Sequence, residues 1–338
     1  MKLKNHQIMY ILIALIPITI LISLKSGYKD ITYLDLLRII FGGGTVKENL
    51  IIVDFRLPRI IIAMLVGIGF SLSGCVLQGI TKNPLSDPGL LGINAGAGFV
   101  VVIFIVMAGT LSFSSIFLLP FFSFIGAGIT GAIIYKLSTN KFLGVEPIRL
   151  VLNGVAIQAG INSIMILIIL KLDKDQHDFL ARWQAGSIWN SNWKLVVTLL
   201  PWIVLGFIAV MLMARNLDIL ALGESISKGL GMHVVKEKRK LLFTAIALAA
   251  ASVAVSGSIS FVGLIGPHLS RKLVGPKHKI LLPASGLVGA LLVLIADIIA
   301  RTIIEPAELP TGIVVSVIGA PYFLFLLMKN RKVKKEAT

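Results

Sequence analysis

Long apolar runs alternate with short polar segments along almost the whole chain. A helix needs about 20 mostly apolar residues to cross the roughly 30 Å of bilayer hydrocarbon. Runs of sufficient length lie near residues 8–24, 58–80, 88–108, 115–135, 148–170, 195–213, 241–257, 280–300 and 310–328. A shorter stretch at 258–270 fits a half-length or broken helix. With this segment included, the pattern predicts an all-α membrane protein whose ten transmembrane helices form one domain over residues 1–338.

The composition supports a protein that has the bilayer as part of its solvent. Hydrophobic residues make up 56% of the chain, and charged residues only 14%. A soluble domain with so few charges could not cover its surface. A single cysteine, Cys75, excludes a disulfide within the chain.

The net charge of +16 has a membrane explanation. Cytoplasmic loops of membrane proteins carry an excess of Lys and Arg, and ten spans with the N-terminus inside place about two thirds of the basic residues on that side. A nucleic-acid partner is therefore not needed. The distribution predicts a multi-pass membrane protein with both termini in the cytoplasm.

Residues 72–98 and 255–290 share a pattern of a Ser-Gly pair, a Pro break and a Gly-rich helix. The helices that enter the two copies run in opposite directions in the predicted topology. This indicates an inverted internal repeat, which in transporters places the pathway between the two halves. Small residues four apart, such as Gly67 and Ser71, predict close contact between helices.

Several kinds of chemistry are missing from the sequence. No G-x-x-x-x-G-K-[ST] phosphate loop occurs, and no two histidines stand four apart. We therefore predict no catalytic residues, no metal site and no cofactor in this chain. Asp297 is the one acid inside a predicted span, and Arg301 four residues later can neutralise it. Energy for transport should accordingly come from outside this polypeptide.

The predicted spans do contain uncharged polar residues, which are candidates for a translocation pathway. Gln158 and Asn162 are four apart and share one helix face. Two interpretations stay open: these residues line an aqueous pathway, or they bond across helix interfaces. The candidate pathway residues are Gln78, Asn94, Asn153, Gln158 and Asn162.

Residues 214–240, between the sixth and seventh apolar runs, are polar and punctuated by glycine. The pattern predicts two short helices with an elbow at Gly229 and Gly231. Their apolar residues have no neighbouring span that could bury them, which indicates a protein partner at this loop.

The stretch "ALGESISKGLG" at 221–231 resembles the coupling loop of the iron-siderophore and cobalamin (FecCD-type) family of ABC importer permeases. The R-x-P-R motif at 56–59 and the block "NPLSDPGLLGINAGAG" that follows are also similar to the family. The segments "RLVLNGVAI", "FVGLIGPHLSR" and "ELPTGIVVSVIGAPYFLFLL" occur in family order. The resemblance covers about residues 50 to 328.

The resemblance implies the fold of a type II ABC importer permease. Two permease subunits, either a homodimer or a heterodimer with a paralogue, would enclose the pathway. Two separate ATPase subunits would bind ATP and Mg, and an extracytoplasmic substrate-binding (lipo)protein would deliver the substrate.

The family's functional residues match specific positions in this sequence. The ATPase-coupling positions are Leu222, Gly223, Glu224, Leu230 and Gly231, and the positions for docking the binding protein are Arg56, Arg59 and Arg301. Glu146 and Pro147 depart from the small hydroxyl residues that some relatives have at the inner constriction. The resemblance therefore does not explain how this chain closes its inner gate.

The family implies a metal chelate or cobalamin as substrate. Uncharged Asn and Gln side chains favour a ferric siderophore, best a ferric hydroxamate. Haem is less favoured, because no His, Tyr or Met is convincingly placed as a haem ligand. A cobalamin or haem importer is an alternative within the family. A secondary transporter is the alternative from another class, and the coupling loop and the lack of an ion site in the spans argue against it.

Overall fold

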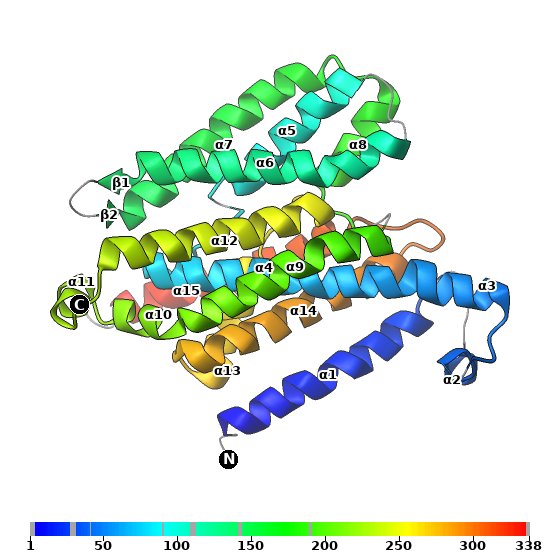
Figure 1. The fold of residues 1–338 in the computed structure, drawn as a ribbon, viewed down its shortest axis with the longest axis horizontal. Coiled ribbons are helices and arrows are strands. Elements are labelled where there is room, and N and C mark those ends of the chain that lie inside the picture. Colours follow the sequence, from blue (N-terminus) through cyan, green and yellow to red (C-terminus); the bar gives the residue numbers. More distant parts are fainter. Residues whose placement is uncertain are drawn as a thin grey trace.

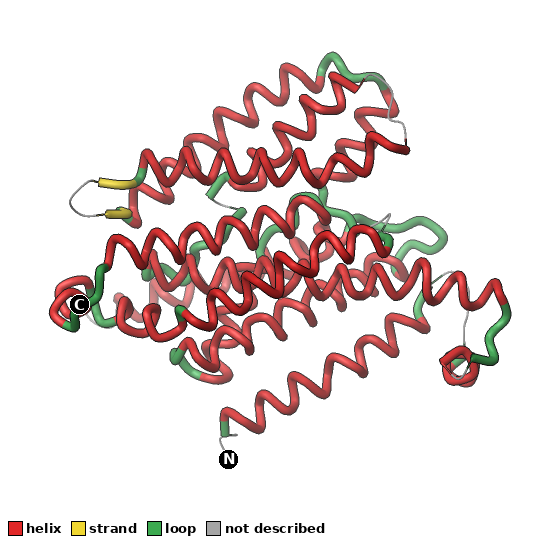
Figure 2. Tube along the Cα trace, in the orientation of Figure 1, coloured by secondary structure: helices red, strands yellow, loops and turns green. Residues whose placement is uncertain are grey.

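The computed structural model describes residues 4–27, 32–40, 42–89, 91–108, 113–140, 144–188 and 191–335. This part of the chain is almost entirely helical (Figures 1 and 2). The long helices are α1 (Asn5–Lys25), α4 (Leu57–Thr81), α5 (Ile93–Ala108), α6 (Phe113–Leu137), α7 (Pro147–Ile169), α9 (Trp193–Leu212), α12 (Val234–Ser256), α13 (Val262–Val274), α14 (His278–Thr302) and α15 (Thr311–Lys335).

Shorter elements connect these helices. They are α2 (Tyr33–Ile40), α3 (Val46–Asn49), the π-helical η1 (Leu50–Arg56), α8 (Lys174–Gln184), α10 (Ala214–Ala221) and α11 (Glu224–Gly229), with the antiparallel strands β1 (Thr139–Asn140) and β2 (Gly144–Val145). The strands form a hairpin between α6 and α7.

Within the described residues, seven helices are long and apolar enough to cross a membrane. Parts of α5 and α15 form two shorter apolar helices, and α13 has 13 residues. The predicted all-α membrane fold is thus confirmed. The number of ten spans stays a prediction, because α5 and α13 have only 16 and 13 residues and only part of α15 is apolar.

Two predicted helices start in different places in the structure. The run at 88–108 becomes helical only at Ile93, because Asn83 and Asp87 accept hydrogen bonds from backbone N–H groups two residues later and form turns. In contrast, α12 begins at Val234 rather than at residue 241. The basic residues 236–240 therefore belong to the first turns of α12, and the loop is shorter than the predicted 214–240.

The broken helix at 258–270 is also displaced. Gly257 and Phe261 both have positive φ angles, which end α12 and delay the start of α13 until Val262. The four residues from 257 to 260 are not helical and connect the two helices. The sequence pattern was right about a break but wrong about which residues form the short helix.

Helix α4 occupies the centre of the bundle, packed by α9, α12, α13 and α14. A Cβ atom on Gly67 would lie 2.2 Å from the carbonyl oxygen of Gly289, and one on Gly74 would lie 1.9 Å from that of Gly263. Side chains at these positions would push the helices apart. The two predicted repeat copies thus pack against each other, while their inverted symmetry stays a prediction.

The bundle has two distinct ends (Figure 1). One carries α10, α11, the β-hairpin and the start of α1, where Asn5 donates a hydrogen bond to Val274 O at 3.0 Å. We call this the loop end. The opposite end carries α2, α3 and the start of α4, and we call it the arginine end.

Candidate functional site

Two adjoining polar cavities lie between α5, α7, α8 and α15. The first has a volume of about 380 Å³ and includes Asn94, Gln158 and Asn162 in its lining. The second, of about 600 Å³, is lined in part by α15. Both cavities share Gln184, Ser258 and Ser260. The shared lining makes a continuous polar surface from α7 to α15.

The cavity residues are positioned by the ends and faces of helices. Asn94 lies in the first turn of α5, where its Nδ2 donates to Ser258 Oγ at 3.1 Å. Its Oδ1 is buried without a hydrogen-bond partner in the described part of the chain. Gln158 and Asn162 line the same cavity one turn apart on α7. The structure therefore brings three of the five predicted pathway residues together.

Gln78 and Asn153 lie elsewhere. Gln78 is buried between α4 and α13, and its Nε2 donates to Gly263 O at 3.2 Å. Asn153 Nδ2 donates to Ser138 Oγ at 3.0 Å, which ties α7 to the end of α6. Neither residue lines the two cavities. For these two, the structure shows bonding between elements, the second of the two interpretations that the sequence left open, and their place in a pathway stays a prediction.

Other cavity residues were missed by the sequence reasoning. Ser258 and Ser260 stand in the non-helical segment between α12 and α13, Gln184 ends α8, and Ser316 lies on α15. The run "SGSIS" at 256–260 carried a usable signal. Hydroxyl residues at a break between two membrane helices are typical of a substrate pathway.

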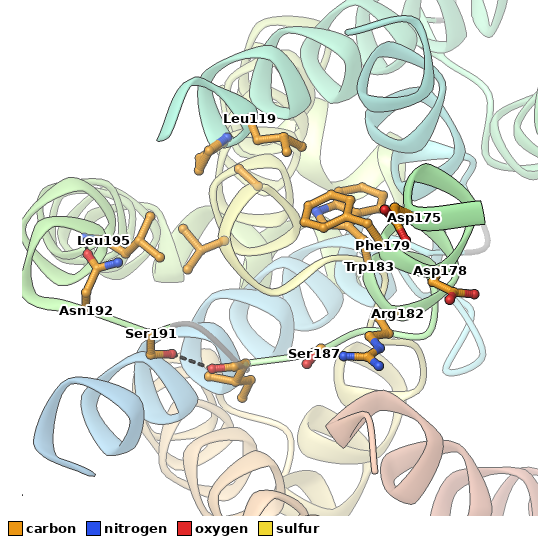
Figure 3. A pocket seen from close by; sticks show the side chains of 14 residues that line it. Leu119, Asp175, Asp178, Phe179, Arg182, Trp183, Ser187, Ser191, Asn192 and Leu195 are labelled. Atoms are coloured by element: carbon orange, nitrogen blue, oxygen red, sulfur yellow. Dashed lines mark hydrogen bonds between the residues drawn. The ribbon is translucent and has the colours of Figure 1, made fainter. Parts of the chain in front are cut away.

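A third cavity of about 380 Å³ lies between α6, α8, α9 and α12 (Figure 3). Leu119, Phe179 and Leu195 are among its apolar lining, while Asp175 lies at its edge. Trp183 of α8 lines both this cavity and the first polar one. The indole therefore lies between the third cavity and the first polar cavity.

The segment between α9 and α12 forms the two short helices that the sequence predicts, α10 and α11. Gly223 joins them at φ +112°, a backbone conformation that side chains disfavour. Ser227 Oγ lies 2.6 Å from Gly223 O and 2.9 Å from Ile219 O, so its hydroxyl fixes this joint. We call the joint between α10 and α11 at Gly223 the elbow, as distinct from the elbow predicted at Gly229 and Gly231. Gly231, with φ +81°, ends α11.

This elbow exposes a stripe of large apolar side chains. Leu222, Ile226 and Leu230 are 57%, 54% and 61% exposed and are spaced four residues apart. Ile226 was not among the residues predicted for coupling. We call these three residues the apolar stripe.

Polar contacts hold the elbow against the long helices. Asp218 Oδ1 accepts hydrogen bonds from the backbone N–H of His278 at 2.9 Å and lies 2.7 Å from its Nδ1. Asn216 Nδ2 donates to Glu237 Oε2 at 2.7 Å. Glu224 pairs with Lys238 of α12. The elbow that carries the apolar stripe is thus hydrogen-bonded to α12 and α14.

At the arginine end, Asp297 is fully buried and is shared by two arginines. Arg59 Nη2 lies 2.9 Å from Asp297 Oδ1, and Arg301 Nε lies 3.1 Å from Oδ2. Thr311 donates to the same carboxylate at 3.2 Å. The i, i+4 pair predicted from sequence is present, but it is part of a larger cluster that joins α4, α14 and α15.

The arginines predicted to dock a binding protein mainly hold helices of this chain. Arg56 donates to the carbonyl oxygens of Leu24 and Lys25, and Arg301 donates to Ser23 Oγ at 2.7 Å. Both arginines are buried, and both contacts reach the end of α1. Arg59 also pairs at 2.8 Å with Glu308, whose side chain is 35% exposed. This last pair brings the cluster to the surface.

Among the described residues, no group of three or more His, Cys, Asp or Glu side chains is placed to hold a metal ion. The candidate site consists of three features: the polar cavities, the apolar stripe at the loop end and the arginine cluster at the arginine end.

Comparison with known proteins gives consistent matches over nearly the full length. The sequence model of the FecCD transport family matches residues 15–329. The chain is 45% identical to the iron(3+)-hydroxamate import system permease protein FhuG of Bacillus subtilis, over 97% of this chain and 99% of the relative. It is 34% identical to the Fe(3+) dicitrate transport system permease protein FecD of Escherichia coli, over 97% and 100%.

A solved structure of a metal-chelate type ABC transporter in an inward-facing conformation has the same fold. Its TM-score is 0.83 at 32% sequence identity, over 96% of this chain and 99% of that chain.

Proposed function

Because the chain belongs to the FecCD transport family, we propose that it is the membrane permease of an ATP-driven importer of ferric siderophores. Separate ATPase subunits hydrolyse ATP, and this chain forms the pathway in a bacterial cytoplasmic membrane with both termini in the cytoplasm. Relatives named as iron-hydroxamate and ferric dicitrate permeases support the proposal.

The apolar stripe is the observation that carries this proposal. Leu222, Ile226 and Leu230 are exposed at the loop end, on the elbow that is bonded to α12 and α14. They lie beside the basic start of α12. Exposed apolar patches rimmed by polar residues are typical of protein interfaces. Because the elbow is bonded to α12 and α14, the movement of a docked ATPase would be transmitted to these two helices.

The second permease subunit is proposed to face α7 and α15. Only 11% of the most apolar window of α7 is buried, although this helix carries the polar Gln158 and Asn162. A lipid-facing helix would not present such amides to hydrocarbon. A partner subunit, whether a second copy or a paralogue, would enclose the polar surface and complete the pathway.

A ferric hydroxamate suits the chemistry of the cavities. Amides and hydroxyls line them beside apolar side chains, and among the described residues no charged side chain contributes to either lining. A neutral, hydrogen-bonding chelate fits such a surface better than an anionic ferric citrate, which would favour cationic partners. Met165 and Trp183 also line the first cavity, so a cobalamin or haem substrate is the second candidate.

The arginine end is proposed to receive the extracytoplasmic binding (lipo)protein. Arg59 and Glu308 form its surface-reaching ion pair, while Arg56 and Arg301 fix the end of α1 beside it. Charge pairs at such a rim set docking register and association rate more than affinity. A secondary transporter is disfavoured, because the buried Asp297 is already paired with two arginines.

Uptake in cells tests the proposed substrate. A strain lacking this chain, and the same strain complemented with it, would be given radiolabelled iron as a ferric hydroxamate, a ferric catecholate, ferric citrate or haem. We expect the chain to restore uptake of the hydroxamate. Restored uptake of haem alone, or of cobalamin in a parallel assay, would replace the proposed substrate.

A further inference from the structure

Lys238 is a buried cation that contacts two other elements at the loop end. Its side chain is 4% exposed, although it lies in a run of basic residues near the start of α12. Lysine is almost never this buried unless it is paired. Its Nζ donates to Glu224 Oε1 of α11 and lies 3.5 Å from the carbonyl oxygen of Val145 in β2. One ammonium group therefore connects α11, α12 and the β-hairpin.

The hairpin in turn is bonded to α7, the helix that lines the first polar cavity. Val145 is buried and is followed directly by the start of α7. The backbone N–H of Glu146 donates to Ser138 O at 3.0 Å, and Asn153 donates to Ser138 Oγ. One and two turns beyond Asn153, Gln158 and Asn162 reach the cavity.

We propose that Lys238 is the positioning residue that couples the α10–α11 elbow to α7 and so to the pathway. The inference rests on the proposed function, since it assigns a role within ATP-driven import. A displacement of α11 would carry Glu224 with it, move the ammonium group and shift the hairpin at the base of α7. The contact lies directly before Glu146 and Pro147, where this chain departs from the small hydroxyl residues that some relatives have.

The chemistry of lysine suits this role. An ammonium group has three donors and can serve a carboxylate and a carbonyl at once. Glu224 is half-buried, and removing either partner would leave a charge without compensation in a partly dry site. The neighbouring Lys240 offers a matched contrast, because it pairs with Glu237 at 2.8 Å on the same helix but is 51% exposed.

The test measures transport and ATP hydrolysis together. The permease would be reconstituted with its ATPase and binding protein, and the ferric hydroxamate taken up per ATP hydrolysed would be determined. For Lys238→Met we expect this ratio to fall by a factor of about three to thirty, the range seen when coupling residues are changed. Lys238→Arg should keep most of the ratio, and Lys240→Met should keep all of it.

A charge swap separates the two contacts of Lys238. Glu224→Lys combined with Lys238→Glu restores an ion pair between α11 and α12, but the introduced carboxylate cannot donate to Val145 O. We expect this double variant to show a low ratio, and ATPase assembly is measured beside it because Glu224 is also a predicted coupling position. If Lys238→Met fails to assemble, the uptake ratio of this double variant tests the link through the hairpin in its place. A normal ratio in the double variant would overturn the link through the hairpin.

A conformational signal distinguishes coupling from simple stability. Ile148 at the start of α7 is 75% exposed, and the natural Cys75 is fully buried, so a dye can be attached through Ile148→Cys. ATP should change its fluorescence in the wild-type background and not in Lys238→Met. An unchanged uptake ratio or a persisting ATP signal in Lys238→Met overturns the inference. If the unmodified complex itself shows no ATP-dependent uptake, the proposed function fails instead.

Discussion

Arg59 and Asp297 form a buried ion pair between helices α4 and α14, with 238 positions of sequence between them. The carboxylate is fully buried, and the Arg59 side chain is 13% exposed. Because Arg301 shares the same carboxylate, one acid holds two cations in a low-dielectric setting. The shared carboxylate therefore holds α4 and α14 together at the arginine end.

Asp297→Asn should destabilise the permease strongly. The neutral amide would leave two buried guanidinium groups without their shared counter-charge, and breaking a buried pair in this way costs about 3–5 kcal/mol. Thermal unfolding in detergent measures the loss.

Glu308→Gln provides the matched control. This acid also pairs with Arg59, but its side chain is 35% exposed, so the change should cost about 1 kcal/mol or less. Equal losses for the two variants would show that burial of Asp297 is not what makes its pair strong.

Gly67→Ala should weaken the packing of α4 on α14. The added Cβ would meet Gly289 O at 2.2 Å, which backbone atoms can relieve only by separating the helices. Overpacking of this kind typically costs about 1–3 kcal/mol. Detergent stability of the purified protein is the measurement.

Gly286→Ala on the facing helix is the control, because its added Cβ would meet only the Ile68 side chain, at 3.6 Å. We expect no loss of stability in this variant. A comparable loss in both variants would mean that helix propensity, rather than close approach, determines the effect.

Ile226→Gln should reduce binding of the ATPase while leaving the permease folded. The side chain is 54% exposed and contributes to the apolar stripe, so its removal affects a partner more than the core. Co-purification of the ATPase with the tagged permease measures this. Glu224 is a poorer choice for such a test, because its pair with Lys238 makes any change there an internal one as well.

Val46→Gln is the control for this change. Val46 is 87% exposed at the arginine end and should leave ATPase binding unaltered. If Ile226→Gln also binds normally, the apolar stripe is not the coupling surface.

Asn162→Leu should lower uptake of the ferric hydroxamate several-fold without affecting assembly. The substitution removes a hydrogen-bonding group from the lining of the first cavity. Uptake in complemented cells, normalised to permease level, gives the result. Thr198→Leu serves as control, because Thr198 lies on α9 and its hydroxyl donates only to Lys194 O in its own helix. Unchanged uptake in Asn162→Leu would place the pathway elsewhere.

The apolar runs predicted the membrane helices well, because hydropathy depends only on local sequence. Five of the ten predicted spans agree with the structure within about two residues at both ends, a spread that helix ends commonly show. The starts of α5 and α12 differ more. A proline- and aspartate-rich turn delayed the first, and a basic but helix-forming run extended the second.

Contacts between distant residues could not be predicted in the same way. The motif at 56–59 marked Arg56 and Arg59 as special, but nothing local indicates that the buried Arg56 reaches α1 or that Arg59 shares Asp297. Likewise, the polar residues of α4 and α7 are alike in sequence. Only the packing shows that Gln78 bonds to α13 while Gln158 faces a cavity.

ATP-dependent uptake by reconstituted protein tests the central claim most directly. The permease, its ATPase and a substrate-loaded binding protein would be placed in proteoliposomes, and radiolabelled ferric hydroxamate would be counted inside. We predict uptake that requires hydrolysable ATP on the loop-end side and that Ile226→Gln abolishes. Equal uptake without ATP, or driven by an ion gradient alone, would contradict the account and identify a secondary transporter.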